Sequence, residues 1–534
     1  MKIRAGFIAA AIAALTAAAP LAPASAETPP NMLVIANRID DIKTFDPAES
    51  FEFAGADVSR NVYEKLVNFD PLNLDAGFGP QLAESWEISA DGRTITFRIA
   101  EGHRFSTGRE VTARDAEFSL RRAVILNKTP SFILTQFGFT PENVEQTIVA
   151  TDDRTLRLTL DKPYALSFVL NCLTATVGGI VDREEAMAHE VDGDMGNAWL
   201  RTNTAGSGPY KVVAWKPNES VLMDLNPHYH GPRPAMERVI VQHIQESATQ
   251  RLLLSRGDID VARNLSPEDV AGLRDDPDVK VVDELRGRLM YWSANQKNPL
   301  LSDPKVVEAL KWATDYDGMA NSFLKGQYTV HQAFLPLTFL GALDEKPWRF
   351  DMDKARAALA ESAHPDCGPI RISVRDAQER IDIAQSLQNT WSQLGCQVEL
   401  IVGTGAQTLD RYRAREHDVY LGAWGPDYPD PHTNAGTFAF NPDNSDEARL
   451  TGLLAWRNAW AVPAGMNEKT LAAVVENDTD KRRAMYLELQ REHQRISPFG
   501  IMFQKIEQNA MRANVNNFVA GGATTAVSYW VVTK

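Results

Sequence analysis

The sequence predicts a mixed α/β protein with several lobes. Strand-like and helix-like segments alternate along the whole chain, without a low-complexity tract or an obvious repeat. Residues 370–402 show the pattern most clearly, as a strand, a helix and a second strand. With 534 residues, the chain is also too long for one hydrophobic core, so we expect two or three lobes. Proteins of this kind usually bind ligands in clefts between lobes or at the ends of strands.

The first 26 residues have the three parts of a secretory signal peptide. Lys2 and Arg4 give a positive start, an apolar alanine-rich run follows, and an Ala-Ser-Ala cleavage motif ends at Ala26. We expect cleavage after Ala26 and export to the periplasm. No cysteine lies near the cut, which argues against a lipid anchor. No later stretch approaches about 18 uninterrupted apolar residues, so we expect a soluble mature protein.

Alternating apolar residues predict strands in the first half of the chain. Residues 93–102 and 155–161 each place apolar side chains at every second position, which is the period of a half-buried strand. Residues 236–244 predict another strand. A helix then starts near residue 247 and ends near Gly257, and a short strand follows it. We interpret this stretch as a βαβ-like unit.

A clearer unit of this kind spans residues 370–402. Strands at 370–374 and 398–402 flank a helix from about residue 377 to 394, and Gly395 ends that helix. One helix face collects apolar residues at spacings of three, four and three: Ala384, Leu387, Trp391 and Leu394. A right-handed crossover makes the two strands parallel neighbours.

The chain contains three cysteines. Cys367 and Cys396 each precede one strand of that unit, so parallel pairing would bring both to the same end of the sheet. We therefore favour a disulfide between Cys367 and Cys396, with Cys172 as a free thiol, in an oxidising compartment. Three buried free thiols are the alternative.

Composition and motifs limit the classes of function. The formal charge of −15, from 70 acidic and 55 basic residues, argues against nucleic acid as a partner, because binding phosphates needs a basic surface. The chain contains no GxSxG elbow, no HExxH pair and no CxxC pair. We therefore expect no catalytic residues, no cofactor and no metal site. Asp427 and Asp430 lie three residues apart, so an exported hydrolase with an interlobe active site is the alternative from another class.

Four segments carry a resemblance to a known family. The first contains "LAESW" and "TARDAEFSLRRA", the second "GSGPY" and "NPHYHG", the third "NPLLSDPKVVEALKWATDYDGM", and the last is "GAWGPDYPDP". They follow one another along the chain, at residues 82–123, 206–241, 298–319 and 422–431. In this order they resemble the periplasmic solute-binding proteins of ABC transporters for oligopeptides, dipeptides and nickel, which are family 5 of the bacterial extracellular solute-binding proteins.

The chain departs from the usual pattern of that family at three places. Residues 106–108 read "STG" instead of the common Asn/His-Asp-Gly turn. His230 stands where Trp is usual, and "VVE" at residues 306–308 lacks the usual arginine pair. These departures argue against naming a substrate by analogy to any single member.

The resemblance implies two lobes of the class II periplasmic-binding-protein type, joined by a two-strand hinge, with a third subdomain inserted in the first lobe. We expect a discontinuous lobe I at residues 27–69, 205–288 and 493–534. The inserted subdomain would span residues 70–204, and lobe II residues 289–492. The hinge would cross near residues 289–295 and 497–504. Closure about such a hinge traps a ligand between the lobes.

The resemblance places the ligand site at residues 422–431. Asp427 matches the acidic residue that forms a salt bridge with the ligand's amine in peptide-binding relatives. Trp424 and Tyr428 would add apolar walls that also carry a polar group. Asp430, followed by proline, fits turn chemistry. The alternative is that Trp424 and Tyr428 are core residues and that Asp427 only shapes a turn.

The first lobe would supply the facing wall of the cleft. Residues 46–66 resemble the family's N-terminal strand-to-helix loop, which lines the cleft. The candidates for ligand contact in this loop are Ser50, Phe51, Glu52 and Phe53. A further candidate is Asn295, at the end of a hinge strand.

Histidines keep a metal chelate open as a cargo. His432 adjoins the site segment, and a nickel carrier in this family could use one histidine beside a chelating small molecule. His228 and His230 alternate on an extended segment, so their side chains would point to opposite faces and not form a metal site.

The combined interpretation is an exported, monomeric solute receptor without enzymatic activity. We predict that it binds peptides or peptide-like small molecules by domain closure and delivers them to a pair of inner-membrane ABC permease subunits. Within this class, the alternative ligands are an opine, an oligosaccharide, or a chelate of nickel or another metal.

Overall fold

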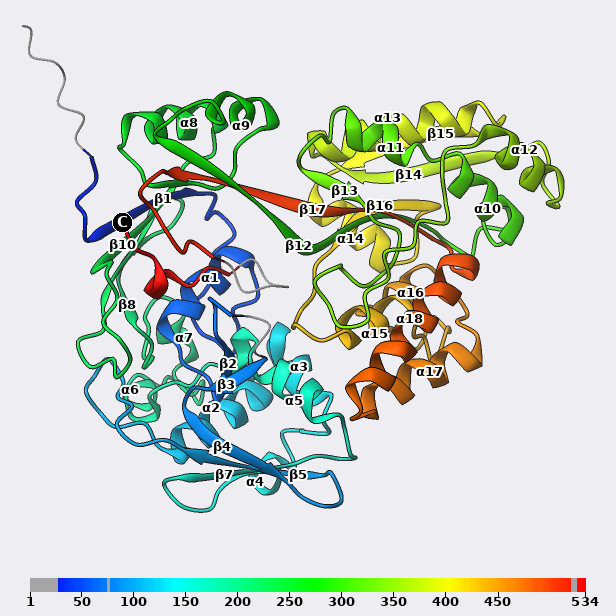
Figure 1. Cartoon of the computed structure of the whole chain (residues 1–534). Helices are drawn as coiled ribbons and strands as arrows, with labels where there is room; N and C mark the ends of the chain where they lie inside the picture. The colour runs from blue at the N-terminus through cyan, green and yellow to red at the C-terminus, as the bar shows by residue number, and fades with distance from the viewer. Residues whose placement is uncertain (1–26, 74–76, 520–525) are drawn as a thin grey trace, which may run out of the picture.

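The computed structural model describes residues 27–73, 77–519 and 526–534. The expected signal peptide, residues 1–26, lies outside this part of the chain. Two bodies lie side by side, and two long strands connect them, β12 (Val279–Ala294) and β17 (Phe499–Arg512) (Figure 1). We call the body with β1 lobe I, together with its inserted subdomain, and the body with β14 lobe II.

Among the described residues, one sheet of 11 strands extends through both lobes. Its order is β15-β14-β16-β12-β17-β11-β1-β10-β9-β8, and β13 pairs with β17. The lobe I strands are β1 (Met32–Asn37), β8 (Tyr210–Lys216), β9 (Ser220–Leu225), β10 (Arg238–His243) and β11 (Val261–Ala262). The lobe II strands are β13 (Tyr328–Val330), β14 (Pro369–Arg375), β15 (Gln397–Gly403) and β16 (Val419–Trp424).

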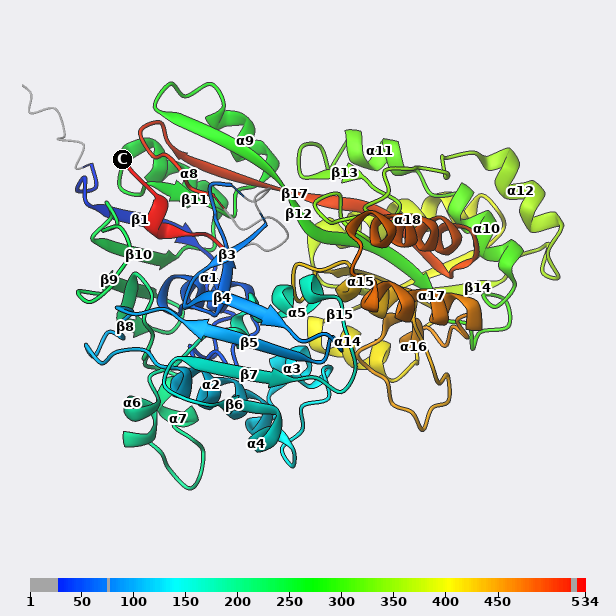
Figure 2. The same cartoon turned by 60° about the horizontal axis from the view of Figure 1, so that its bottom comes forward.

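β12 and β17 pass between the lobes (Figure 2). Their antiparallel pairing has an interruption. The regular register stops at Leu285, opposite Ile506, and resumes at Leu289, opposite Gln504. Residues 286–288 therefore fall outside the regular ladder. We propose that the hinge bends here, next to the stretches expected from the sequence.

Lobe I contains the first expected βαβ-like unit. β10 is followed by helix α8 (Ser247–Arg256), which ends at Gly257 with a left-handed φ of 80°, and then by β11. β1 lies between β10 and β11 and runs parallel to both. The other helical segments of lobe I are α1 (Phe53–Val62), α9 (Pro267–Leu273) and the 3₁₀ turn Tyr529–Val531.

The inserted subdomain has its own sheet, in the order β4-β5-β7-β6. The alternation at residues 93–102 and 155–161 is confirmed, because Ile95 and Phe97 on β5 and Leu156 on β7 are buried. The strands are β4 (Ala83–Ile88), β5 (Thr94–Ile99), β6 (Ile148–Ala150) and β7 (Thr155–Thr159), with a separate pair β2 (Val67–Phe69) and β3 (Phe78–Pro80). The helical segments are α2 (Ala113–Leu126), α3 (Phe132–Thr135), α4 (Val144–Thr147), α5 (Leu166–Leu173), α6 (Arg183–Ala188), α7 (Asn197–Leu200) and the 3₁₀ turns Thr129–Ser131 and Thr176–Gly178.

Lobe II contains the second expected unit. Helix α13 (Gln378–Ser392) connects β14 to β15, and these strands pair in parallel. Trp391 on α13 packs edge-on against Trp292 of β12, with 5.3 Å between ring centroids. The remaining helices are α10 (Pro304–Trp312), α11 (Tyr316–Asn321), α12 (Met352–Ala360), α14 (Gly405–Arg413), α15 (His432–Phe438), α16 (Leu454–Arg457), α17 (Ala464–Val475) and α18 (Thr479–Ile496). None of the helices in the described ranges is long and apolar enough to cross a membrane.

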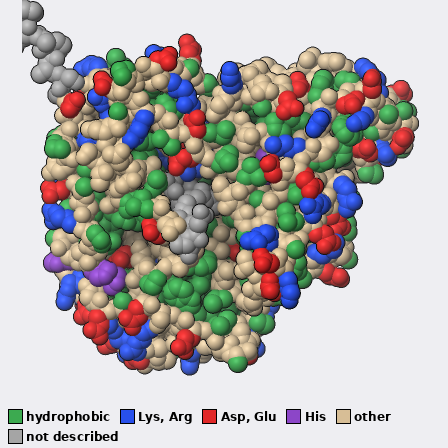
Figure 3. Space-filling model, in the orientation of Figure 1, with side chains coloured by type: hydrophobic (Ala, Val, Ile, Leu, Met, Phe, Trp, Pro, Cys, Tyr) green, Lys and Arg blue, Asp and Glu red, His purple; other side chains and the backbone are tan. Residues whose placement is uncertain are grey.

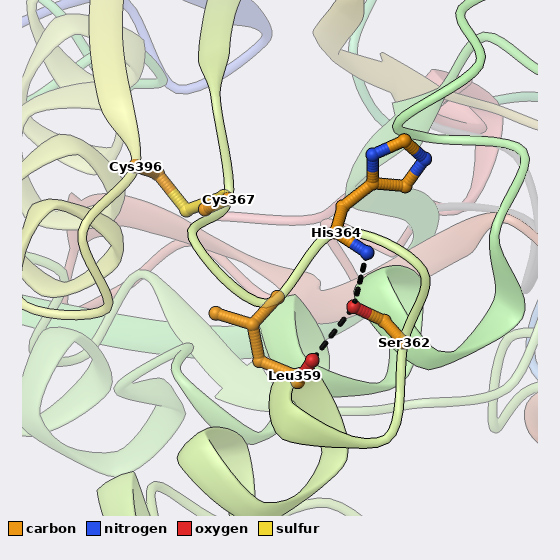
Figure 4. The surroundings of a disulfide bond; sticks show 5 residues. All are labelled: Leu359, Ser362, His364, Cys367 and Cys396. Carbon is orange, nitrogen blue, oxygen red and sulfur yellow. Dashed lines mark hydrogen bonds between the residues drawn. A yellow bond between two sulfur atoms is a disulfide. The ribbon is translucent and has the colours of Figure 1, made fainter.

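A disulfide joins Cys367 to Cys396 at the start of the parallel strands β14 and β15 (Figure 4). The loop before Cys367 is fixed by Ser362, whose hydroxyl donates to the Leu359 carbonyl at 2.6 Å and accepts from the His364 N–H at 3.0 Å. Cys172 is a buried free thiol. The pairing favoured from the sequence is therefore present in the structure.

Candidate ligand-binding site

A cleft of about 1240 Å³ lies between the lobes. Its walls come from lobe I, the inserted subdomain, the hinge strands and lobe II. This volume is somewhat larger than the roughly 300–1,000 Å³ of ordinary small-molecule sites. On the face shown in Figure 3, basic and acidic side chains are interspersed. This face therefore does not resemble the basic footprint of a nucleic-acid-binding protein.

The segment 422–431 leaves the sheet at the end of β16 and enters α15. β16 runs antiparallel to β12, so that Trp424 lies opposite Leu289 beside the hinge. The Asp427 N–H donates to the Thr433 hydroxyl at 3.1 Å, which ties the loop to the first turn of α15. The loop therefore presents its side chains at the cleft from a fixed backbone.

Asp427 lines the cleft and is partly buried. In the described part of the chain, its carboxylate has no hydrogen-bond or ion-pair partner. Burial raises the pKa of this carboxyl to about 7, while the positive charge of Arg457 acts in the opposite direction. A buried carboxylate without a partner is costly unless a cation compensates it, so the site is suited to a positively charged group.

Asp430 has the opposite environment, and the sequence-based interpretation of it as a turn residue is incomplete. Its carboxylate accepts two hydrogen bonds from Arg482 of α18, at 2.7 and 2.8 Å, and caps the His432 N–H at 2.9 Å. Asn171 of α5 also donates to it at 3.2 Å. Helix α5 lies beside this loop in both views (Figures 1 and 2). Asp430 therefore connects lobe II to the inserted subdomain.

Trp424 and Tyr428 both line the cleft, with different surroundings. The indole N–H of Trp424 is buried and has no partner within the described residues. The Tyr428 ring is buried and packs against Phe168 of α5, with 5.8 Å between ring centroids. Tyr428 therefore contributes to the contact between the lobes as well as to the cleft wall.

The predicted loop of lobe I also lines the cleft, with Ser50, Phe51, Glu52 and Phe53. The Ser50 hydroxyl is buried and lacks a partner among the residues described. Phe51 and Phe53 are exposed, and the Phe53 ring lies against Gly425 on the other side of the cleft. Glu52 forms an ion pair with Lys43 at 3.6 Å.

Two expected site residues do not belong to the cleft lining, and their role in ligand binding stays a prediction. The buried Asn295 amide donates to the carbonyls of Arg415 and His417 at 2.9 and 2.8 Å, so it fixes a loop of lobe II. His432 packs edge-on against Phe168 at 5.2 Å, and burial lowers the pKa of its imidazole to about 4. No histidine or cysteine belongs to the described lining of the cleft.

Two cationic side chains in the cleft were not anticipated. Arg380, in the first turn of α13, is only 8% exposed, and Lys65 in lobe I is only 4% exposed. Within the described ranges, neither side-chain cation has a hydrogen-bond or ion-pair partner. Burial lowers the pKa of Lys65 to about 7, with a contribution from Arg60; burial and Arg288 lower the pKa of Arg380. Both groups are suited to an anion.

A sequence signal for Arg380 existed in the topology. Helix α13 starts at the carboxyl end of β14, which is where α/β sheets usually bind ligands. Lys65 gives no such signal, because its burial depends on residues that are distant in sequence.

Several other charges in the cleft are paired with one another. Arg263 forms ion pairs with Asp57 and, at 2.9 Å, with Glu507. Glu507 also accepts from Arg286 at 2.7 Å, and these contacts hold the pKa of Glu507 at about 2. This network joins lobe I to the hinge strands.

A two-lobed α/β chain with a cleft between the lobes, crossed by a pair of hinge strands and lined by unpaired charges, defines a solute-binding protein. The chain belongs to the Bacterial extracellular solute-binding proteins, family 5, since the sequence pattern described as that family's middle part matches residues 77–446. The fold class and the resemblance inferred from the sequence are thus confirmed.

Individual relatives cover nearly the whole chain. The Probable D,D-dipeptide-binding periplasmic protein DdpA of Escherichia coli K12 is 28% identical over 501 residues, 93% of either chain. Di/tripeptide-binding protein 2 of Pseudomonas aeruginosa UCBPP-PA14 is 26% identical and covers 89% of this chain and 90% of its own. Among solved structures, the periplasmic binding protein DppA from Helicobacter pylori in complex with peptide STSA has a TM-score of 0.79 at 22% identity, with coverage of 94% and 98%.

Proposed function

We propose that this protein is the periplasmic substrate-binding component of an ABC importer for peptides or peptide-like solutes. The observation that carries the proposal is Asp427, a partly buried carboxylate that lines the interlobe cleft and has no partner in the described part of the chain. The protonated amino terminus of a peptide would supply the missing cation. An ionised carboxylate paired with an amine would offset the cost of its desolvation.

The cationic groups support the same class of ligand. A peptide with a free amine also has a free carboxylate, and Arg380 of lobe II and Lys65 of lobe I both offer an unpaired positive charge. We propose Arg380 as the partner of the terminal carboxylate, because it lies on the same lobe as Asp427. The exposed rings of Phe51 and Phe53 would contact the apolar parts of the solute.

The relatives point to the same role. The two relatives described above are named for a D,D-dipeptide and for di- and tripeptides, and one of them is named as periplasmic. Together with the signal peptide predicted at residues 1–26, this favours a periplasmic location. We propose that closure at the interruption of β12 and β17 retains the solute, and that the closed form delivers it to membrane permease subunits.

The first experiment identifies the natural ligand. The protein is purified from its native host, unfolded, and the released small molecule is measured by mass spectrometry. The ligand-free protein is then screened by thermal shift against peptides, opines, oligosaccharides and nickel chelates. A ligand at 100 times its Kd adds about 2.7 kcal/mol of stability, so the true class is visible in such a screen. Turnover of any of these compounds would instead support the hydrolase alternative.

The second experiment tests the role of Asp427 by calorimetry. A peptide with a free amino terminus is compared with its N-acetylated form, in wild type and in Asp427→Asn. We expect the free-amine peptide to lose roughly 10²–10³-fold in affinity in the variant, since breaking a buried charge pair costs about 3–5 kcal/mol. Acetylation should matter much less in the variant than in wild type. Equal binding of both peptides by wild type would refute the proposal.

A further inference from the structure

A cluster of two histidines and one glutamate lies outside the cleft lining. It consists of Glu64, His103 and His230, and one ligand atom from each lies within 4.8 Å of the others. We propose that this cluster binds a transition-metal dication such as Zn²⁺, at the junction between lobe I and the inserted subdomain. The proposal is independent of the solute that occupies the cleft.

The donor atoms are already close to the spacing that a metal needs. His103 Nδ1 lies 3.2 Å from Glu64 Oε2, and the rings of His103 and His230 are 3.8 Å apart at 32°. Donors about 2.1 Å from a tetrahedral zinc lie roughly 3.4 Å from one another. Shifts of about an ångström would therefore bring all three donors to one ion.

Hydrogen bonds to backbone carbonyls hold the three segments in place. The Glu64 carbonyl accepts from the Ile180 N–H at 2.9 Å, and the His103 carbonyl accepts from the Val111 N–H at 2.9 Å. The loop that carries His230 is anchored by Asn226, whose amide donates to the Gly208 carbonyl at 3.0 Å. The ligands therefore come from three segments distant in sequence, and each segment is fixed before a metal binds.

The chemistry of the donors selects the metal. Two imidazoles and one carboxylate are suited to Zn²⁺, Ni²⁺ or Cu²⁺, whereas Mg²⁺ and Ca²⁺ prefer oxygen donors alone. Glu64 and His103 are each only 3% exposed, and in the described residues the Glu64 carboxylate contacts no Lys or Arg side chain. A metal ion would supply this buried carboxylate with a positive charge in place of a protonated His103.

The position of the cluster fits a resident metal and not a cargo. Glu64 lies between α1 and β2, His103 follows β5 of the inserted subdomain, and His230 follows β9 of lobe I. His230 is exposed, which gives the ion an entry path and leaves a fourth position for water. One ion would thus join the inserted subdomain to lobe I.

Calorimetry with ZnCl₂ tests the proposal on untagged mature protein that has been stripped of metal with EDTA. We expect one Zn²⁺ per chain in wild type, and at least a tenfold weaker affinity in His230→Gln, which removes one of three ligands. Zn²⁺ should also raise the melting temperature of wild type and not that of the variant. His230 is exposed, so His230→Gln should fold, and its melting temperature in EDTA checks this.

His228→Gln is the matched control. His228 is an exposed histidine on the same loop, but its ring packs on Gly108 and it does not belong to the cluster. We expect this variant to bind Zn²⁺ like wild type, while Glu64→Gln binds it more weakly. Absence of a stoichiometric Zn²⁺ site in wild type would overturn the proposal. Equal Zn²⁺ affinity in His230→Gln and His228→Gln would overturn it as well.

Discussion

Replacement of Asp427 by asparagine should stabilise the ligand-free protein while it removes ligand affinity. The carboxyl pKa is about 7 in the folded protein and 3.8 in the reference state, because burial disfavours the ionised form. One pKa unit corresponds to about 1.36 kcal/mol, so keeping the carboxylate ionised costs about 4 kcal/mol at pH 8. Asparagine has a similar shape and avoids this cost.

The pH dependence of the effect has a definite sign. The folded pKa of Asp427 is raised, so the unfolded chain loses this proton more easily, and the carboxylate destabilises the fold increasingly as pH rises from 3.8 to about 7. The gain from Asp427→Asn should therefore be largest at pH 8 and fall below about 1 kcal/mol near pH 4. Denaturant unfolding of ligand-free protein at several pH values measures it.

Asp430→Asn is the matched control, because it makes the same chemical change three residues away. Asp430 is paired with Arg482, and the variant leaves that guanidinium buried without its partner. We expect a loss of about 3–5 kcal/mol, opposite in sign to the effect at Asp427. If Asp427→Asn leaves unfolding unchanged between pH 5 and 8, or destabilises the protein most at pH 8, the assignment of Asp427 as an unpaired buried charge is refuted.

Further predictions concern the two cations and the disulfide. Lys65→Met should stabilise the ligand-free protein, and more at pH 6 than at pH 9. Burial lowers the Lys65 pKa to about 7, because burying the charged amine costs free energy that the neutral amine does not. An equal stabilisation at both pH values would contradict this. Arg380→Met should weaken the binding of a peptide with a free C-terminal carboxylate by about 10²-fold, as measured by calorimetry. The same peptide with a C-terminal amide should lose much less affinity. Equal losses of affinity for the two peptides would exclude a ligand carboxylate as the partner of Arg380. Replacing Cys367 and Cys396 by serine opens a loop with a sequence separation of 29. The free energy of unfolding, measured by urea denaturation, should therefore fall by about 3–4 kcal/mol. An unchanged free energy of unfolding would mean that the disulfide does not form.

The elements that were predicted correctly have patterns contained in a short stretch of sequence. Apolar spacing on α13 and a glycine after it were enough to predict the β14-α13-β15 unit and, through parallel pairing, the disulfide. Asp427 was found for a different reason, since its segment resembles a family motif and its position in the cleft follows from the fold.

The residues that the sequence missed, and the two candidates that lie outside the cleft lining, depend on contacts between distant segments. Asn295 and His432 have polar groups that suggest a site, but they are surrounded by residues of lobe II and of α5. Arg380 lies in a helix whose polar residues suggest a solvated face, yet it is buried, with Arg288, Tyr420 and Tyr328 nearby. His230 looked isolated because its neighbours are Glu64 and His103, far away along the chain.

The interruption in the β12–β17 ladder has a mechanical consequence. Arg286, Gly287 and Arg288 belong to it, and they also line the cleft. If the hinge bends there, as proposed above, the backbone that rotates when the lobes separate would also form part of the cleft wall. A solute in contact with this backbone would act directly on the angle between the lobes. Two solutes of equal affinity but different length would thus hold the molecule at different angles, and a transporter that recognises this angle would distinguish them.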